Sequence, residues 1–174
     1  RAMEHDWLIV DGYNVINAWK ELSVLAVDSL DHARHKLLER LASYGAFRDM
    51  RVVVVFDAYE RTGEAVLEEN AAVTVVFTAA GETADSYIER LTYEVVRRGE
   101  TVYVVTNDWA EQLTVLGAGA YRRSTRELIE DCRRAAREME NEKRARLDLG
   151  RSELGSRVGK ETWEKLEEWR RRGR

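Results

Sequence analysis

Four short apolar runs, separated by segments with helical periodicity, constrain the fold of this chain more than any other feature. They lie at residues 7–10, 52–56, 73–77 and 102–105 and are rich in valine. Runs of this length and composition are typical of strands that are buried on both faces of a sheet. Because they alternate with helices through short connections, we predict an α/β fold with a mostly parallel sheet covered on both faces.

The intervening segments carry apolar positions every three or four residues. One helix is expected to run from Leu30 to Tyr44, with Gly45 placed to end it. A second is expected to begin near Thr83, a good N-cap residue. Its inward face is predicted to comprise Ala84, Ile88, Leu91 and Val95. A short helix over residues 109–116 and a brief fifth strand near residues 120–121 complete this part of the chain.

The C-terminal part of the chain is more strongly charged. Residues 124–127 have the capping-box spacing, so a long helix is predicted to start there and run toward Leu147, with an early apolar face of Leu128, Ile129 and Cys132. Residues 150–160 contain three glycines and are predicted to form a linker. A last helix over 161–170 would then dock through Trp163, Leu166 and Trp169. We therefore predict a domain at residues 1–132 and a charged helical extension at 133–174.

Length and composition limit the class of protein. A chain of 174 residues can bury one sizeable core, and its single cysteine, Cys132, excludes an internal disulfide. The sequence has neither an apolar run near the roughly 18 residues that span a bilayer nor a charged-then-apolar leader. We expect a cytoplasmic protein with no membrane partner.

Charge is distributed unevenly along the chain. Residues 1–119 hold 11 Lys+Arg and 20 Asp+Glu, whereas residues 120–174 hold 17 Lys+Arg and 12 Asp+Glu. An acidic first part suits a cation, and a basic second part suits a phosphate backbone. Mixed-charge helices are also common as solvated faces, so the asymmetry alone leaves both interpretations open.

An aspartate follows each apolar run: Asp11, Asp57, Asp85 and Asp108. The carboxyl ends of parallel strands share one edge of a sheet, where ligands bind. Carboxylates gathered there repel each other unless a cation compensates, and hard oxygen ligands suit Mg²⁺ or Mn²⁺. Each aspartate also has a structural alternative, since aspartate is favoured in turns, at N-caps and in the first turn of a helix.

Neighbouring polar residues are weaker candidates. Asn14, three residues after Asp11, is suited either to orienting a water or phosphate or to capping a turn. Glu82 and Thr83 flank Asp85 and could support a metal ligand. Residues 106–107 are lesser candidates for phosphate contacts.

Several competing chemistries lack their motifs. A phosphoaspartate phosphatase of the haloacid dehalogenase type requires a second aspartate two positions after Asp11, where this chain has Tyr13. Neither G-x-G-x-x-G after the first strand nor G-x-x-x-x-G-K-[ST] is present, so no organic cofactor is expected. Metal-assisted phosphodiester hydrolysis remains, or a binding module that shares the fold.

The ordered set IVDGYNVINAW, VVVVFDA, FTAAGETADSYIERL, VVTNDWAEQ and GAYRRSTREL closely resembles the YacP-type NYN-domain proteins of the PIN-like nuclease group. This resemblance implies a PIN-like three-layer α/β/α fold and an endoribonuclease that associates with the ribosome and cuts messenger RNA during translation. By resemblance, the four aspartates fall on the acidic site of the family and Asn14 on its motif asparagine. Asn107 departs from the family, which has a serine before the last aspartate.

The expected mechanism is hydrolysis of RNA by a water that Mg²⁺ or Mn²⁺ activates. Asp11, Asp85 and Asp108 are the expected metal ligands, and Asp57 and Asn14 would complete the catalytic pocket. The residues expected to bind RNA are Tyr13, Trp109, Arg122 and Arg123. Aromatic core packing and solvated arginines remain alternatives for these four, and a noncatalytic RNA- or ribosome-binding adaptor remains the alternative function.

Overall fold

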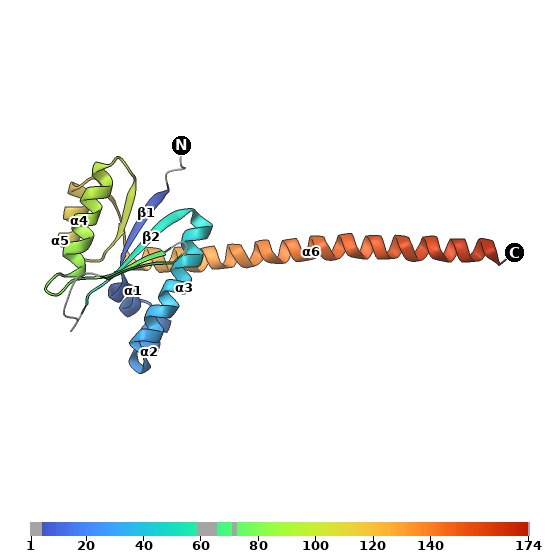
Figure 1. Cartoon of the computed structure of the whole chain (residues 1–174), viewed down its shortest axis with the longest axis horizontal. Coiled ribbons are helices and arrows are strands. Elements are labelled where there is room, and N and C mark those ends of the chain that lie inside the picture. The colour runs from blue at the N-terminus through green and yellow to red at the C-terminus, as the bar shows by residue number, and fades with distance from the viewer. Residues whose placement is uncertain (1–4, 59–65, 71–72, 174) are drawn as a thin grey trace. The chain divides into compact units, whose positions relative to one another are not determined.

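The computed structural model describes residues 5–58, 66–70 and 73–173 (Figure 1). The strands are β1 (Asp6–Asp11), β2 (Met50–Phe56), β3 (Val66–Asn70), β4 (Val73–Phe77), β5 (Val102–Val105) and β6 (Tyr121–Arg123). The helices are α1 (Gly12–Ala18), α2 (Lys20–Asp28), α3 (Leu30–Arg48), α4 (Ala84–Arg97), α5 (Trp109–Gly117) and α6 (Thr125–Arg172).

The strands form one sheet in the order β3-β4-β2-β1-β5-β6. Five strands are parallel, and only β3 pairs antiparallel, with β4. The chain leaves β1 toward β2 and β4, then returns to add β5 and β6 on the other side. Strand order therefore reverses between β1 and β5, which is where ligands bind in open α/β sheets. The mostly parallel sheet expected from the sequence is confirmed.

Helices cover both faces of the sheet, with α4 and α5 on one face and α1, α2 and α3 on the other (Figure 1). Successive strand residues point to opposite faces, so a strand buried on both sides must be apolar throughout. Val53 and Val55 of β2 pack with Ile88 of α4, whereas the alternating residues Val52 and Val54 face away from that cluster and are also fully buried. The three-layer α/β/α fold is thus confirmed.

The sequence placed most of these elements correctly. Thr83 caps α4, and its hydroxyl accepts a hydrogen bond from the backbone N–H of Ser86 at 3.1 Å. α1, α2 and β3 were not predicted from the sequence. The first two are short helices that follow β1 directly, and too few turns are present for their periodicity to stand out.

Gly45 does not end its helix, contrary to the prediction. α3 continues to Arg48 and ends at Asp49, whose left-handed backbone (φ 55°) forms the C-cap. A Cβ atom on Gly45 would lie 2.7 Å from Cγ2 of Val52. The glycine therefore permits α3 to pack closely on β2.

The linker predicted for residues 150–160 is also wrong, because α6 is one continuous helix. A glycine inside a helix costs about 1 kcal/mol relative to alanine, which weakens a helix without breaking it. The sequence contains no proline, and ion pairs four residues apart add stability. Those after residue 135 are Glu140–Arg144, Glu142–Arg146, Glu167–Arg171 and Glu168–Arg172.

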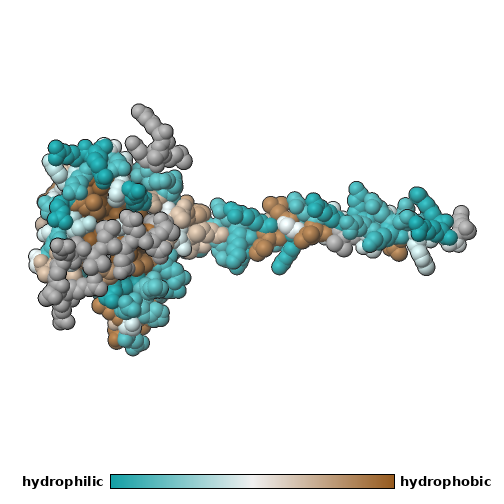
Figure 2. All heavy atoms as spheres, viewed as in Figure 1, coloured by the Kyte–Doolittle hydropathy of each residue, from teal (hydrophilic) through white to brown (hydrophobic). Residues whose placement is uncertain are grey.

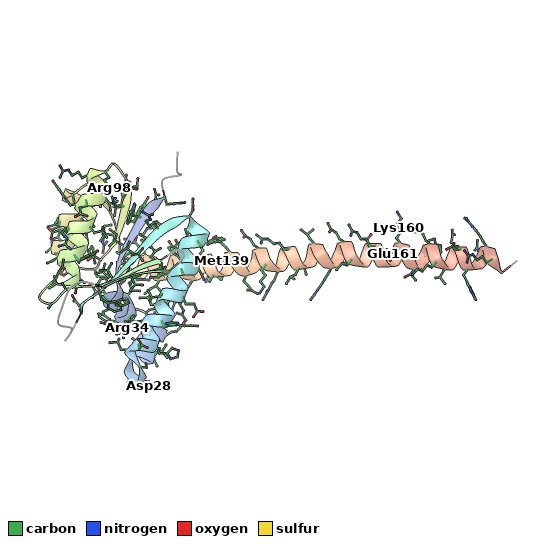
Figure 3. All side chains as sticks on the ribbon, viewed as in Figure 1. Asp28, Arg34, Arg98, Met139, Lys160 and Glu161 are labelled. Carbon is green, nitrogen blue, oxygen red and sulfur yellow. The ribbon has the colours of Figure 1, made fainter. Side chains whose placement is uncertain are left out.

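The described chain divides into two compact units, residues 1–135 and residues 136–174. We call them the sheet domain and the extension. The extension is mainly hydrophilic with isolated apolar patches (Figure 2), and its side chains, Lys160 and Glu161 among them, project from the helix (Figure 3). Trp163, Leu166 and Trp169 are exposed. Docking through these residues stays a prediction, as does the boundary at residues 132–133.

Candidate active site

Asp11 ends β1 at the point where strand order reverses. Its carboxylate caps α1 by accepting a hydrogen bond from the backbone N–H of Asn14 at 3.2 Å. The residue is only 8% exposed. The pKa of Asp11 is raised to about 6, mainly by burial; the charges of Asp85 and Asp57 add to the increase, and the hydrogen bond from Asn14 opposes it. Two of the other three predicted aspartates, Asp57 and Asp85, therefore lie close enough to act electrostatically on Asp11.

Asp57 and Asp108 each hold the start of a helix. Asp57 follows β2, and its Oδ1 accepts a hydrogen bond from the backbone N–H of Ala84, which fixes the N-terminus of α4. Asp108 is the N-cap of α5 and accepts from the N–H groups of Ala110 and Glu111, at 2.8 and 3.1 Å. Asp85 lies in the first turn of α4 and is exposed. Asp11 and Asp108 therefore do act as helix N-caps, which is the structural alternative to a catalytic role.

Glu111 joins this acidic group and was missed by the sequence analysis. Its pKa is raised to about 7, mainly by burial; Asp85 and Asp11 add to the increase, and a 2.8 Å hydrogen bond that the Thr106 hydroxyl donates to Oε2 opposes it. The other oxygen, Oε1, is buried with no hydrogen-bond partner among the described groups, and the Asp85 carboxyl interacts with the Glu111 side chain. Glu111 lies three residues after the N-cap Asp108, in the first turn of α5. This spacing is the signal in the sequence that could have placed Glu111 near Asp108.

The donor chemistry of this edge fits a hard divalent cation. In the described ranges, no three His, Cys, Asp or Glu side chains converge into a ready-made metal site. Mg²⁺, however, retains several waters and is bound through only one or two carboxylates. Burial is the main cause of the raised pKa values of Asp11 and Glu111, and neighbouring carboxylates add to it; a bound cation would compensate these like charges.

Gly12 and Tyr13 pack against Phe56 next to Asp11. A Cβ atom on Gly12 would lie 2.2 Å from the ring of Phe56, so only glycine fits between the start of α1 and β2. The ring of Tyr13 lies 4.9 Å from that of Phe56, and its hydroxyl accepts a 3.0 Å hydrogen bond from Arg34 on α3. Figure 3 labels Arg34 on this side of the sheet domain. Tyr13 is thus held firmly at the carboxyl edge.

Of the other residues predicted to bind RNA, Trp109 is exposed, whereas Arg122 and Arg123 have hydrogen-bond partners within the protein. Trp109 is 69% exposed at the start of α5. Arg122 donates a 3.2 Å hydrogen bond from Nε to the carbonyl of Thr106. Arg123 donates to the Tyr44 hydroxyl at 2.9 Å and lies over the ring of Tyr103.

Three of the weaker candidates have structural partners. Asn107 donates from Nδ2 to the hydroxyl of Thr125 at 2.6 Å and accepts from the backbone N–H of Thr125 at 3.1 Å. It therefore fixes the start of α6. Thr106 donates to Glu111, and Glu82 pairs with Arg90 at 3.0 Å.

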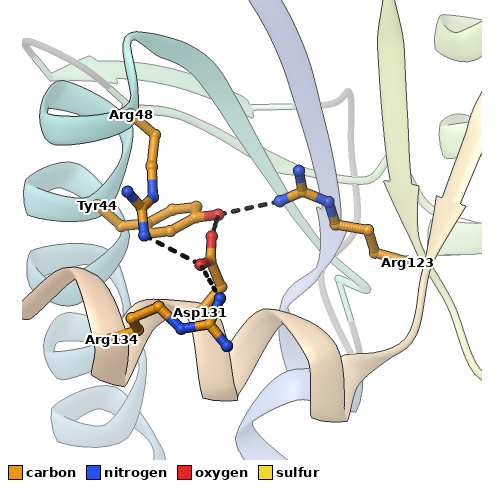
Figure 4. Close-up of polar contacts among 5 residues, drawn as sticks. All are labelled: Tyr44, Arg48, Arg123, Asp131 and Arg134. Atoms are coloured by element: carbon orange, nitrogen blue, oxygen red, sulfur yellow. Dashed lines mark hydrogen bonds and ion pairs between the residues drawn. The ribbon is translucent and has the colours of Figure 1, made fainter.

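A polar network fastens the first turns of α6 to the sheet domain (Figure 4). The Tyr44 hydroxyl donates a short hydrogen bond to Asp131, which also pairs with Arg48 at 3.0 Å and Arg134 at 3.7 Å. Burial raises the pKa of Tyr44 to about 12. For Asp131, burial acts upward, but hydrogen bonds from Tyr44 and Arg48 dominate and lower its pKa. The network joins α3, β6 and α6.

The fold and its acidic edge define a PIN-like domain of the NYN type, a nuclease-type domain. The chain belongs to the YacP-like NYN domain family, whose pattern matches residues 8–171. It is 36% identical to the uncharacterized protein YacP of Bacillus subtilis (strain 168), over 95% of this chain and 97% of that protein.

Solved structures support the same assignment. The crystal structure of Rae1 (YacP) from Bacillus subtilis is similar with a TM-score of 0.70, at 35% identity over 95% of both chains. A tryptophan-to-leucine variant of that protein matches with a TM-score of 0.68, at 38% identity over 78% of this chain and 79% of the other. In the part of the chain that the structure describes, no helix is long and apolar enough to cross a membrane.

Proposed function

We propose that this protein is a divalent-metal-dependent endoribonuclease that hydrolyses RNA phosphodiester bonds. The observation that carries the proposal is the buried Asp11 carboxylate, whose pKa is raised to about 6 by burial and by the charges of Asp85 and Asp57 at the point where strand order reverses. A fold gains no stability from such repulsion. A site that receives a cation and a phosphate explains why the charges are gathered.

Each acidic residue has a distinct task in this proposal. Asp11 and Asp85 would be the principal ligands for Mg²⁺ or Mn²⁺, directly or through water, and Asp108 and Glu111 would complete the acidic edge. The bound ion would lower the pKa of a water and neutralise charge that develops on the phosphoryl oxygens. Asp57 positions Asp85 because it holds the N-terminus of α4.

The RNA would be held by groups around this edge. Asn14 is exposed at the start of α1 and would orient a water or a nonbridging phosphate oxygen. Tyr13 and Trp109 offer rings on which bases can stack, and Arg122 and Arg123 offer phosphate contacts. We extend the proposal to messenger RNA on translating ribosomes in the cytoplasm, because the family resemblance implies that substrate.

The test is cleavage of messenger RNA on translating ribosomes, with and without Mg²⁺ or Mn²⁺, read by mapping new 5′ ends. We expect metal-dependent cuts that Asp85→Asn abolishes without changing folding or ribosome binding. Asp28→Asn is the matched control, because Asp28 is an exposed carboxylate at the end of α2. Cleavage that persists in Asp85→Asn would remove Asp85 from the mechanism.

A noncatalytic RNA- or ribosome-binding adaptor is the second candidate. Two observations favour it: the basic residues 120–174, and the capping roles that Asp11, Asp57 and Asp108 fulfil without any reaction. This candidate requires ribosome co-sedimentation together with intact messenger under either ion. The acidic edge counts against it, since concentrated negative charge weakens binding to a phosphate backbone.

A further inference from the structure

A groove between α4 and α5 opens beside the acidic edge. Its volume is about 230 Å³, several times the roughly 30 Å³ that one water occupies. The groove is lined along successive turns of α4 by Asp85, Ile88, Glu89 and Thr92. From Asp85 to Thr92 the helix rises about 10 Å. A group that enters the groove would therefore lie next to whatever the acidic edge binds.

The walls of the groove combine apolar surface with acceptors. Ile88 and Val115 face each other from α4 and α5 and are buried, and Ala118 is small enough to leave space between the helices. Asp85 and Glu89 line the same groove with carboxylates. Ionised carboxylates only accept hydrogen bonds, so an occupant must supply N–H or O–H donors.

The side chain of Thr92 indicates that the groove binds a ligand. The residue is 1% exposed, and its hydroxyl has no hydrogen-bond partner among the described groups. A buried hydroxyl without a partner destabilises a fold, and valine would fill the same volume without that cost. A bound group that exchanges a hydrogen bond with this hydroxyl accounts for its presence.

We propose that the α4–α5 groove is a nucleobase subsite that accepts a base with an exocyclic amino group from single-stranded RNA. The inference rests on the proposed endoribonuclease function, which brings RNA to the adjacent edge. A base is planar with apolar faces, which suits the walls formed by Ile88, Val115 and Ala118. The apolar walls are unsuited to a hydrated ion, which would need polar partners on all sides.

The carboxylates select among the bases. Adenine and cytosine each present an amino donor beside a ring acceptor, and guanine presents an amino group beside a ring N–H. Uracil has one N–H flanked by two carbonyl oxygens, which carboxylates repel. Glu89, an exposed residue at the groove, is placed to receive the amino group, while the Thr92 hydroxyl reaches a ring nitrogen or carbonyl from within.

The experiment titrates the full-length protein with cytidine, adenosine, guanosine and uridine while recording methyl NMR signals of Ile88, Val115 and Ala118. Uncharged nucleosides need neither metal nor cleavage, so the outcome is independent of whether the protein proves to be a nuclease. We expect saturable shifts with the amino-bearing nucleosides and weaker binding of uridine. Absent shifts, or equal affinity for uridine and cytidine, would overturn the subsite even if RNA cleavage is established.

Two variants test the assigned contacts. Thr92→Val should weaken cytidine binding by about 3- to 10-fold, the effect of one hydrogen bond, while the urea midpoint stays unchanged or rises. Thr114→Val is its matched control, because the Thr114 hydroxyl lines the same groove but already donates to the carbonyl of Ala110 at 3.1 Å. A lower urea midpoint with unchanged cytidine affinity in Thr92→Val would assign the hydroxyl to the fold and refute the subsite.

The second variant, Glu89→Gln, tests selection of the base. It should reduce the preference for cytidine over uridine, because a carboxamide replaces one acceptor oxygen by a donor. Glu94→Gln, an exposed change on the same helix, should leave that preference unchanged. An unaltered cytidine preference in Glu89→Gln would refute the contact and the selection derived from it.

Discussion

Replacing Tyr44 by phenylalanine would remove one hydroxyl that serves two charged partners. In the wild-type protein this hydroxyl donates to Asp131 and accepts from Arg123 at 2.9 Å, and the residue is 1% exposed. A hydrogen bond to a charged group contributes about 1.5–3 kcal/mol. Asp131 retains Arg48 and Arg134 and stays partly open to water, so we discount the sum of two such bonds. We expect a loss of about 2–3 kcal/mol.

The measurement is the free energy of unfolding from urea titration at pH 7, supported by thermal melting. For a chain of this size, that loss corresponds to a Tm lower by roughly 4–12 °C. Tyr93→Phe is the matched control, since Tyr93 is 61% exposed on α4. A loss for Tyr44→Phe no larger than that of the control would refute the reasoning.

The same variant predicts a pH dependence with a definite sign. The folded-state pKa of Asp131 is lowered from its usual 3.8, so its contribution is present above that value and is lost as pH falls through the folded pKa. The difference in unfolding free energy between wild type and Tyr44→Phe should therefore be full at pH 7 and shrink below about pH 4. A difference that grows on acidification would contradict the assignment of Asp131 as the charged partner.

Three further changes test other parts of the structure. Gly12→Ala should destabilise the protein by about 1–3 kcal/mol in urea titration, because its Cβ would overlap the ring of Phe56; unchanged stability would mean that α1 can shift. Gly155→Ala, which has open space around the Cβ, should slow amide exchange in the extension and strengthen that helix by about 0.5–1 kcal/mol. Mg²⁺ should raise the Tm of wild type more than that of Asp85→Asn, and a chelator should reverse the increase.

Much of the candidate site was accessible to sequence reasoning because it depends on where strands end. Asp11 and Asp57 follow apolar runs directly, and parallel strands bring their carboxyl ends to one edge. Asp57 and Asp85 act electrostatically on Asp11, while the catalytic and metal-binding roles of these residues stay predictions. Glu111 was missed because a lone glutamate in the first turn of a short helix is ordinarily solvated.

The class of fold could be predicted from the sequence alone, since apolar periodicity and capping residues such as Thr83 act over a few neighbouring positions. Tertiary structure decided what depends on distant contacts. Gly45 is required by Val52 on the neighbouring strand rather than by the end of its own helix, and Asn107 holds Thr125 eighteen residues away. Burial between α5 and the sheet edge, which no local pattern records, turned Glu111 from a surface charge into a member of the acidic group.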